Sequence, residues 1–490
     1  MIAVIVNTEG YEYDIHSLVK AFYPQSDVKV FVEGEKEFTS DAGLPMIRIV
    51  RSRERILLLS ACKGTEGEGA GVIRREAALE PESDKVRVKN ILKQMLYQVL
   101  SEYTGRTLPW GTLTGIRPTR IAMTFLEQGQ TPAEIFRYMQ DTYFVSEQKG
   151  RLCIDIARRE RELLSHIHYR DGYSLYIGIP FCPTTCLYCS FTSYPLAAWK
   201  TRMGDYLDAL EREIADTAQM FRDRVLDSVY IGGGTPTTLP PEALERLLTR
   251  VRSAFDFTHV QEFTVEAGRA DSITEEKLRL LQAYGVTRIS VNPQTMKEET
   301  LHLIGRQHTV AQVEDAFRLA RACGFTNINM DIILGLPGET EEDVRRTTEM
   351  IEALGPDSLT VHSLAVKRAS RLSRWIAENG LQAIRNTDAM MEIAASSAGA
   401  MGMEPYYLYR QKNMSGNFEN VGYARPGCYG IYNILMMEEM QTIAALGAGS
   451  ISKRVYPDGR IERCENVKEV SQYIERIGEM IERKRVLLED

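Results

Sequence analysis

Ser174-Leu-Tyr-Ile-Gly-Ile-Pro-Phe-Cys182-Pro-Thr-Thr-Cys186-Leu-Tyr-Cys189 joins a strand-like segment to three cysteines with the spacing C-x3-C-x2-C. Three thiolates with no fourth cysteine nearby can bind three irons of a cubane and leave the fourth iron open to a ligand that is not protein. Zinc is the competing interpretation, but structural zinc sites use four ligands, and no histidine or fourth cysteine completes this motif. The pattern therefore predicts a [4Fe–4S] cluster with one open iron.

From residue 174 onward, short strand-like segments alternate with amphipathic helical segments. The expected strands span 174–180, 228–232, 262–267, 288–292, 328–334 and 358–366, and the expected helices span 202–221, 241–255, 275–284, 311–323 and 341–354. This alternation indicates βαβ units in a parallel sheet, either open or curved into a partial barrel. Ligands of such sheets bind at the carboxyl ends of the strands, which is where the cysteines stand.

The flanking regions have other patterns. Short β-type segments up to residue 80 and helical periodicity over 85–164 predict an N-terminal α+β region over 1–165. Its Gly/Pro-rich segment 108–119 is expected to be a structural turn between two helices, with a docking surface as the alternative. After a sheet domain over 170–370, residues 371–490 form a mixed C-terminal region that ends in an amphipathic helix over 467–485. We expect this region to cover the substrate site, although an interface is also compatible with its periodicity.

The overall composition is that of an ordinary folded protein. A chain of 490 residues exceeds what one hydrophobic core usually supports, so more than one domain is expected. A formal net charge of −8 leaves no basic surplus for general nucleic-acid binding. No apolar run has the length of a membrane span, and the N-terminus shows no basic leader or cleavage site. We therefore expect a cytoplasmic protein with no membrane span.

Three stretches resemble the radical SAM superfamily, and within it the oxygen-independent coproporphyrinogen III oxidase group. They are the cysteine stretch 176–191, the turn Ile231-Gly-Gly-Gly-Thr-Pro-Thr-Thr238 and, for the HemZ type within that group, Tyr407-Leu-Tyr-Arg-Gln-Lys-Asn-Met-Ser-Gly-Asn-Phe-Glu-Asn420. The resemblance implies an α/β fold with a partial (β/α)6 barrel that holds a [4Fe–4S] cluster and S-adenosyl-L-methionine (SAM). It also implies that SAM binds the open iron through its amino and carboxylate groups, and that its reductive cleavage leaves a 5′-deoxyadenosyl radical.

The resemblance further implies a set of SAM contacts. Backbone groups of Gly233, Gly234 and Thr235 meet the SAM amino group, Arg306 pairs with the SAM carboxylate, and Gln294 and Asp331 reach the ribose hydroxyls. The other matching positions are Tyr176, Tyr188, Glu266, Ala365 beside the adenine and, more loosely aligned, Ile451. A polar residue near a strand end is usually solvated or capping when taken singly, so the joint order and spacing carry this interpretation. No side chain is assigned as catalytic, and Tyr176 is a candidate for a positioning role.

The activity implied by the resemblance is oxidative decarboxylation of two propionates of coproporphyrinogen III to vinyl groups, which gives protoporphyrinogen IX in haem biosynthesis. A tetrapyrrole is then the substrate, and an electron donor such as flavodoxin or ferredoxin is the expected partner. Two departures from the well-known dehydrogenase weaken the transfer of substrate chemistry: Gly178 replaces its histidine, and Phe191 replaces its extra cysteine. The Phe191 form is shared with related haem chaperones.

Two other functions therefore stay open: a haem chaperone of the same fold, and a radical SAM enzyme that acts on another tetrapyrrole. The chaperone ranks lower, because none of the seven histidines stands in a clear haem-ligand motif. If the substrate carries propionates, basic side chains near the strand ends are candidate anchors. These are Lys367, Arg368, Arg371, Arg410 and Lys412.

Overall fold

The computed structural model describes residues 1–24, 26–33, 40–41, 44–62, 72–80, 84–190, 193–366, 370–380, 384–411 and 418–489. The chain forms two compact units. One consists of Met1–Asp155 with Arg410–Phe418, and the other of Ile156–Tyr409 with Glu419–Asp490. The division into 1–165, 170–370 and 371–490 stays a prediction, and strands from both of the later ranges share one sheet in the second unit.

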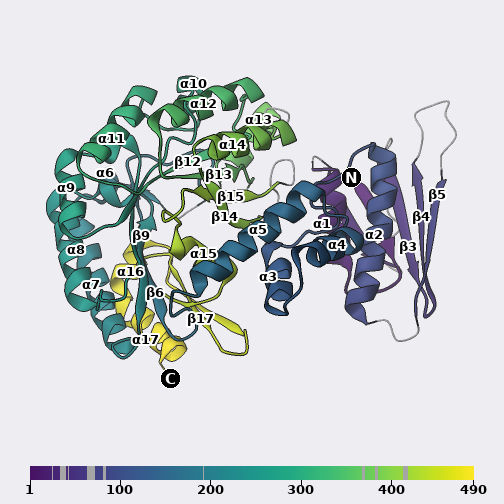
Figure 1. Cartoon of the computed structure of the whole chain (residues 1–490), viewed down its shortest axis with the longest axis horizontal. Helices are drawn as coiled ribbons and strands as arrows, with labels where there is room; N and C mark the ends of the chain where they lie inside the picture. Colours follow the sequence, from purple (N-terminus) through teal and green to yellow (C-terminus); the bar gives the residue numbers. More distant parts are fainter. Residues whose placement is uncertain are drawn as a thin grey trace. The chain divides into compact units, whose positions relative to one another are not determined.

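The first unit is built on a five-stranded sheet with the order β2-β1-β3-β4-β5 (Figure 1). Its strands are β1 Ile2–Val6, β2 Val28–Val32, β3 Pro45–Arg51, β4 Arg55–Cys62 and β5 Val72–Ala78. β1 runs parallel to β2 and β3, whereas β3, β4 and β5 are antiparallel neighbours. The helices α1 (Glu12–Phe22) and α2 (Lys85–Thr104) bury their apolar faces in the same core. This arrangement confirms the N-terminal α+β region and adds α1 and β5 to the predicted elements.

The Gly/Pro-rich segment 108–119 connects α2 to α3 (Thr119–Glu127), as its structural interpretation predicts, and α4 (Pro132–Tyr143) and α5 (Glu147–Leu164) follow. Arg410 packs on this segment: its guanidinium lies 5.5 Å from the Trp110 ring centroid and donates to the Leu113 carbonyl at 2.6 Å. Arg410 is 5% exposed. These contacts give Arg410 a structural role and do not support its interpretation as a substrate anchor.

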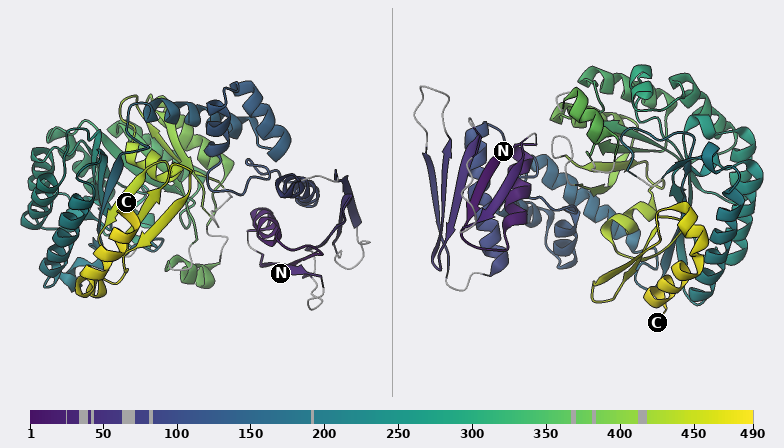
Figure 2. Two further views of the ribbon diagram at one scale, coloured as in Figure 1. Left: turned by 90° about the horizontal axis from the view of Figure 1, so that it is seen from below. Right: turned by 180° about the vertical axis from the view of Figure 1, so that it is seen from behind.

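The second unit contains an eleven-stranded sheet with the order β14-β15-β13-β12-β11-β10-β9-β6-β16-β17-β18. Its central strands are parallel: β6 (Tyr173–Ile179), β9 (Leu226–Gly233), β10 (Glu262–Gly268), β11 (Arg288–Val291), β12 (Ile328–Leu334) and β13 (Ser358–Ser363). The connecting helices are α7 (Met203–Met220), α8 (Pro241–Ala254), α9 (Glu275–Ala283), α11 (Val310–Ala322) and α12 (Glu341–Leu354). Figure 1 and Figure 2 show these helices along the outer side of the sheet. The predicted α/β fold with βαβ units is confirmed.

Residues after 370 extend this sheet at both ends. β15 (Asn420–Ala424) pairs antiparallel with β13 and with β14 (Glu404–Tyr409). At the other end, β16 (Thr442–Leu446) runs parallel to β6, and β17 (Ile451–Val455) and β18 (Ile461–Glu465) follow as antiparallel neighbours. The helix expected over 467–485 is two helices, α16 (Val470–Glu475) and α17 (Ile477–Leu488), because the backbone leaves helical geometry at Arg476, where φ is −109°. Among the described residues, no helix is both long and apolar enough to cross a lipid bilayer.

A buried carboxylate joins the C-terminal helices to the parallel sheet. Glu213 on α7 is fully buried and pairs with Lys484 on α17, which is 1% exposed. Its oxygens also accept hydrogen bonds from the Tyr473 hydroxyl at 2.6 Å, the Asn466 amide at 2.7 Å and the Gly447 N–H at 2.8 Å. Each carboxylate oxygen therefore has two donors, which offsets the cost of burying the charge.

Lys484→Met leaves the buried Glu213 carboxylate without its counter-charge. We expect the free energy of unfolding to fall by about 3–5 kcal/mol, because an uncompensated charge remains in the core. Arg485→Met is the matched control: Arg485 pairs with Asp216 between the same two helices but is 39% exposed, so the expected loss is at most about 1 kcal/mol. Urea unfolding followed by circular dichroism measures both losses. Equal losses would contradict the role given to Glu213.

Candidate functional site

The three cysteines lie at the carboxyl end of β6. Cys182 ends β7 (Phe181–Cys182), and Cys186 and Cys189 follow in the loop before β8 (Tyr194–Pro195). All three are half-buried, and the Cys189 N–H donates to the Cys186 carbonyl at 3.3 Å. Among the described residues, no three His, Cys, Asp or Glu side chains already converge on one metal position. The loop therefore carries three half-buried thiols close together in the chain.

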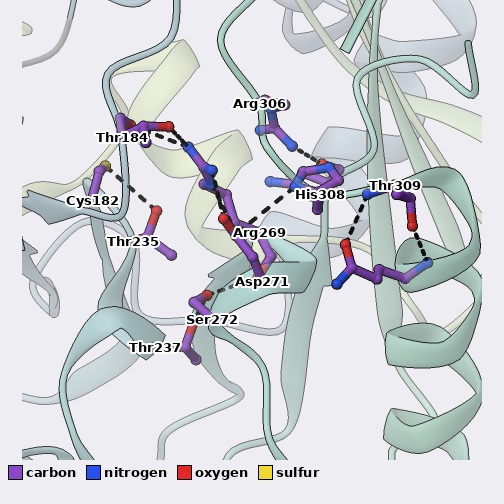
Figure 3. Close-up of polar contacts among 12 residues, drawn as sticks. Cys182, Thr184, Thr235, Thr237, Arg269, Asp271, Ser272, Arg306, His308 and Thr309 are labelled. Atoms are coloured by element: carbon purple, nitrogen blue, oxygen red, sulfur yellow. Dashed lines mark hydrogen bonds and ion pairs between the residues drawn. The ribbon is translucent and has the colours of Figure 1, made fainter. Parts of the chain in front are cut away.

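The glycine-rich turn after β9 packs directly against the strand that leads to Cys182. The Gly234 N–H donates to the Ile179 carbonyl at 2.8 Å, and the Thr235 N–H donates to the Phe181 carbonyl at 2.7 Å. A Cβ on Gly234 would lie 2.6 Å from the Phe181 carbonyl oxygen, so glycine is required at this close approach. The Thr235 hydroxyl lies 3.5 Å from the Cys182 sulfur (Figure 3). The turn and the first cysteine are thus held together.

Most of the predicted site residues stand on consecutive parallel strands or directly after them. In strand order they are Tyr176 in β6, Gly233 at the end of β9, Glu266 in β10, Gln294 after β11, Asp331 in β12 and Ala365 after β13. Arg306 follows the short helix α10 (Glu298–Leu303), and Tyr188 lies in the cysteine loop. Ile451 is set apart from the others, because it begins β17 and is 40% exposed. The fold therefore brings residues from the whole parallel sheet to one edge.

A row of buried polar atoms along the end of β11 has no hydrogen-bond partner within the described residues. These atoms are Ser290 Oγ, Asn292 Oδ1, Gln294 Oε1 and Arg306 Nε. Gln294 has a positive φ of 69°, which is uncommon for a residue other than glycine, and its main chain bonds to Asp331 and Ile333. Buried polar atoms normally find partners, so these four unpaired atoms, which belong to residues in β11 and after it, are candidates for contact with a polar ligand.

Two carboxylates on β10 and β12 have different electrostatics. Burial raises the pKa of Glu266 to about 7, although the Tyr230 hydroxyl donates to it. Burial also acts to raise the pKa of Asp331, but His362 and the Asn329 amide, which donates at 2.6 Å, bring that pKa below its usual value. Glu266 therefore titrates near neutral pH, whereas Asp331 stays ionised.

Three stacked tyrosines lie beside Glu266, and only Tyr176 among them was predicted as a site residue. The ring centroids of Tyr176, Tyr230 and Tyr432 lie 4.5–6.2 Å apart with nearly parallel planes. Tyr230 pairs in register with Tyr176 across β6 and β9, and Tyr432 belongs to α15 (Ile431–Glu438). Strand register and helix docking place these rings together, and neither is visible in a local sequence pattern.

The basic residues near the cysteine loop differ from those predicted. Arg371 is exposed and donates to the Thr185 carbonyl within the loop. Lys367, Arg368 and Lys412 lie outside the described residues, as does Phe191. Besides the predicted Arg306, a second arginine is buried against the loop: Arg269, which is 2% exposed and was not predicted. Its position directly after β10 is the sequence signal that could have indicated it.

Known proteins similar to this chain define its family. The model of the Radical SAM superfamily matches residues 176–351. HemZ of Bacillus subtilis (strain 168), named an oxygen-independent coproporphyrinogen-III oxidase-like protein, is 41% identical over 408 residues, which are 82% of this chain and 81% of HemZ. The chain belongs to this HemZ family of radical SAM proteins. The heme chaperone HemW of the same organism is 31% identical over 309 residues, 62% of this chain and 76% of HemW.

A solved structure supports the fold. The coproporphyrinogen III oxidase HemN from Escherichia coli, described as a radical SAM enzyme, matches with a TM-score of 0.50 and 24% identity. The match covers 66% of this chain and 73% of HemN. This likeness confirms the predicted radical SAM fold.

Radical SAM proteins use a [4Fe–4S] cluster and SAM, so membership of the family gives this chain these cofactors. The residues at the strand ends fit them. The cysteine loop offers three thiols, and the unpaired atoms after β11 offer acceptors for hydroxyl groups and a guanidinium N–H for a carboxylate. Burial raises the pKa of the Cys182 thiol to about 11, so iron binding has to displace its proton. A Cβ on Gly232 would lie 3.0 Å from the Glu266 carboxylate, so the turn leaves room beside that group.

Replacing any one of Cys182, Cys186 and Cys189 by alanine is expected to abolish the [4Fe–4S] cluster, because each iron but one needs its own thiolate. Cys323→Ala and Cys464→Ala are matched controls, since both thiols are half-buried and lie in other elements. Iron and sulfide analysis after anaerobic reconstitution, with EPR of the reduced protein, measures the outcome. Complete cluster content in the Cys186→Ala protein would contradict the assignment.

SAM affinity is expected to fall as the pH drops through the Glu266 pKa of about 7. Below that pH Glu266 is protonated and can no longer accept a hydrogen bond from the SAM amino group as a carboxylate, and each further pH unit lowers its charged fraction about tenfold. Glu266→Gln should remove this dependence. Glu262→Gln is the control, because Glu262 is also buried with a raised pKa but stands at the other end of β10. Equilibrium dialysis of SAM between about pH 6 and 7.5 measures the effect, and a flat wild-type profile would refute it.

Proposed function

We propose that this chain is an oxygen-independent coproporphyrinogen III dehydrogenase. The reaction converts two propionate side chains of coproporphyrinogen III to vinyl groups and gives protoporphyrinogen IX, a step of haem biosynthesis. The observation that supports it most is the row of unpaired polar atoms after β11, because ligands of parallel sheets bind at strand ends and this row fits SAM. The substrate class is supported by the 41% identity to HemZ, a coproporphyrinogen-III oxidase-like protein.

In this proposal the cysteine loop holds three irons of the cluster and the strand ends hold SAM. Arg306 pairs with the SAM carboxylate. Its Nη1 donates to the Asn292 carbonyl while its buried Nε is unpaired, so the guanidinium is already oriented for a ligand. Gln294 and Asp331 accept from the ribose hydroxyls, and main-chain groups of 233–235 meet the amino group. The remaining contacts are Tyr176, Tyr188, Glu266, Ala365 and Ile451.

When bound, the cluster and SAM supply a 5′-deoxyadenosyl radical that takes a hydrogen atom from the substrate. At each of the two propionates, the β-carbon loses one hydrogen atom, the carboxylate leaves as CO2 and one electron passes to an acceptor, so a vinyl group remains. The protein supplies no nucleophile in this scheme. Its residues hold the target carbon in place and exclude water. The stacked rings of Tyr176, Tyr230 and Tyr432 offer an aromatic surface beside this site. An electron donor such as flavodoxin or ferredoxin completes the scheme.

A haem chaperone on the same fold is the second candidate, because HemW is 31% identical over 62% of this chain. Haem capture by such a protein is usually completed by an axial ligand such as histidine. Close to the strand ends, His308 is fully buried and the His362 ring lies 3.8 Å from Asp331. Neither presents an exposed, unpaired imidazole, which favours the dehydrogenase. A radical SAM enzyme for another tetrapyrrole would use the same SAM site and differ in its product.

Anaerobic incubation of the reconstituted protein with coproporphyrinogen III, SAM and a chemical reductant is expected to give protoporphyrinogen IX and 5′-deoxyadenosine. Mass spectrometry of the oxidised porphyrins identifies the loss of two carboxyl groups. The Cys186→Ala protein is the control and should give neither product. Stable haem binding by the wild-type protein without either product would instead indicate the chaperone.

A further inference from the structure

A buried arginine holds the segment between the first two cysteines (Figure 3). Arg269 is 2% exposed, and its Nη1 donates to the Thr184 hydroxyl at 2.7 Å and to the Thr184 carbonyl at 3.2 Å. Its Nε and Nη2 donate to the two carboxylate oxygens of Asp271 at 3.0 Å and 2.7 Å. This bidentate pair fixes the plane of the guanidinium, so that the remaining nitrogen is directed at the cysteine loop.

The same contacts reach the segment that carries Arg306. Asp271 Oδ1 lies 3.8 Å from Nδ1 of His308, which is fully buried and stands two residues after Arg306. The Thr184 hydroxyl donates to the carbonyl of Gly305, directly before Arg306, at 2.8 Å. These contacts, together with the chain segments 269–271 and 305–308, therefore form a closed loop of residues, which we call the Arg269 ring. Its members are Thr184, Arg269, Asp271, His308 and Gly305.

The charges of the ring balance each other and leave Arg306 available to a ligand. Burial acts to raise the pKa of Asp271, but His308 and Arg269 lower it, so this carboxylate is ionised and neutralises Arg269. Burial lowers the pKa of His308, so its ring is neutral at pH 7. Among the described residues Arg306 has no carboxylate partner and its Nε is unpaired, while the rest of its guanidinium interacts with the Asn292 carbonyl, Tyr188 and Cys186. The ring therefore holds the backbone of 305–308 without forming an ion pair with the Arg306 guanidinium.

We propose that Arg269, Asp271 and His308 are positioning residues that set the cysteine loop relative to Arg306. This rests on the proposed assignment of the cluster to the three cysteines and of the SAM carboxylate to Arg306. SAM has to bond to the open iron and to Arg306 at once. A misplaced loop therefore weakens SAM binding even when the cluster is complete. The three residues act through Thr184 and through the backbone of Arg306, without contact to SAM or iron.

Arg269→Lys tests the proposal, because a lysine keeps the charge but cannot bond both oxygens of Asp271 and Thr184 together. We expect unchanged iron and sulfide content and a SAM dissociation constant raised about tenfold to hundredfold. A correspondingly higher SAM concentration should be required to produce the SAM-induced change in the EPR spectrum of the reduced cluster. Arg279→Lys is the matched control: Arg279 forms a pair of hydrogen bonds with Glu275 on α9, but it is 67% exposed and makes no contact with the loop.

A complete cluster with wild-type SAM affinity in the Arg269→Lys protein would overturn the proposal. If this variant fails to assemble the cluster or melts early, His308→Gln decides. It removes the imidazole from the ring without a direct change at the cysteine loop. We expect a complete cluster and SAM binding weakened about twofold to tenfold, because the 3.8 Å contact between the imidazole and Asp271 contributes at most about as much as one hydrogen bond. Unchanged SAM affinity in a fully loaded His308→Gln protein would then overturn the proposal.

These measurements need no tetrapyrrole, which separates this inference from the proposed reaction. A wild-type protein that binds the cluster and SAM and responds to Arg269→Lys, yet leaves coproporphyrinogen III unchanged, would support the positioning role and overturn the dehydrogenase. A wild-type protein that takes up no cluster, or takes it up and binds no SAM, would overturn both.

Discussion

The close contact between the ends of β6 and β9 is the constraint on which the rest of the site depends. Main-chain bonds from Gly234 and Thr235 reach the two strand residues on either side of Pro180, directly before the first cysteine, and leave no space for a Cβ on Gly234. β16 pairs with the other edge of β6, so the cysteine loop starts from a strand that is fixed on both sides. The base of the cysteine loop is therefore held in place by main-chain hydrogen bonds on both sides.

The strand ends are organised for a ligand at a cost to the folded chain. The stability of the folded chain is lowered by the unpaired buried atoms at Gln294 and Arg306 and by the positive φ of Gln294. The buried carboxylate of Glu213 shows the contrast, because both of its oxygens are paired within the fold. Binding of a polar molecule regains the lost hydrogen bonds without rearranging the strands. A site whose polar atoms are already in position before the ligand binds is preorganised.

Sequence patterns predicted what depends on local chemistry. The six parallel strands and their helices, and the position of the cysteines at a strand end, were all predictable. The parts that were missed depend on pairing between distant segments. β16 lies beside β6 through long-range register, Tyr432 reaches Tyr230 from a C-terminal helix, and Arg269 meets a cysteine loop that comes much earlier in the chain. Arg410 shows the opposite kind of error. Its charge alone suggested a substrate anchor, but its guanidinium donates to the Leu113 carbonyl and has a structural role.

A helix of the C-terminal region packs close to the carboxyl group of Glu266. The strand ends that fit SAM all come from the parallel sheet, and relatives named as oxidase-like protein and as chaperone both match much of this chain. Tyr432 of α15 stacks on Tyr230, and Tyr230 donates to Glu266, so a shift of α15 changes the surroundings of the carboxyl that titrates near neutral pH. The electrostatics of the strand ends therefore depend on the packing of a C-terminal helix.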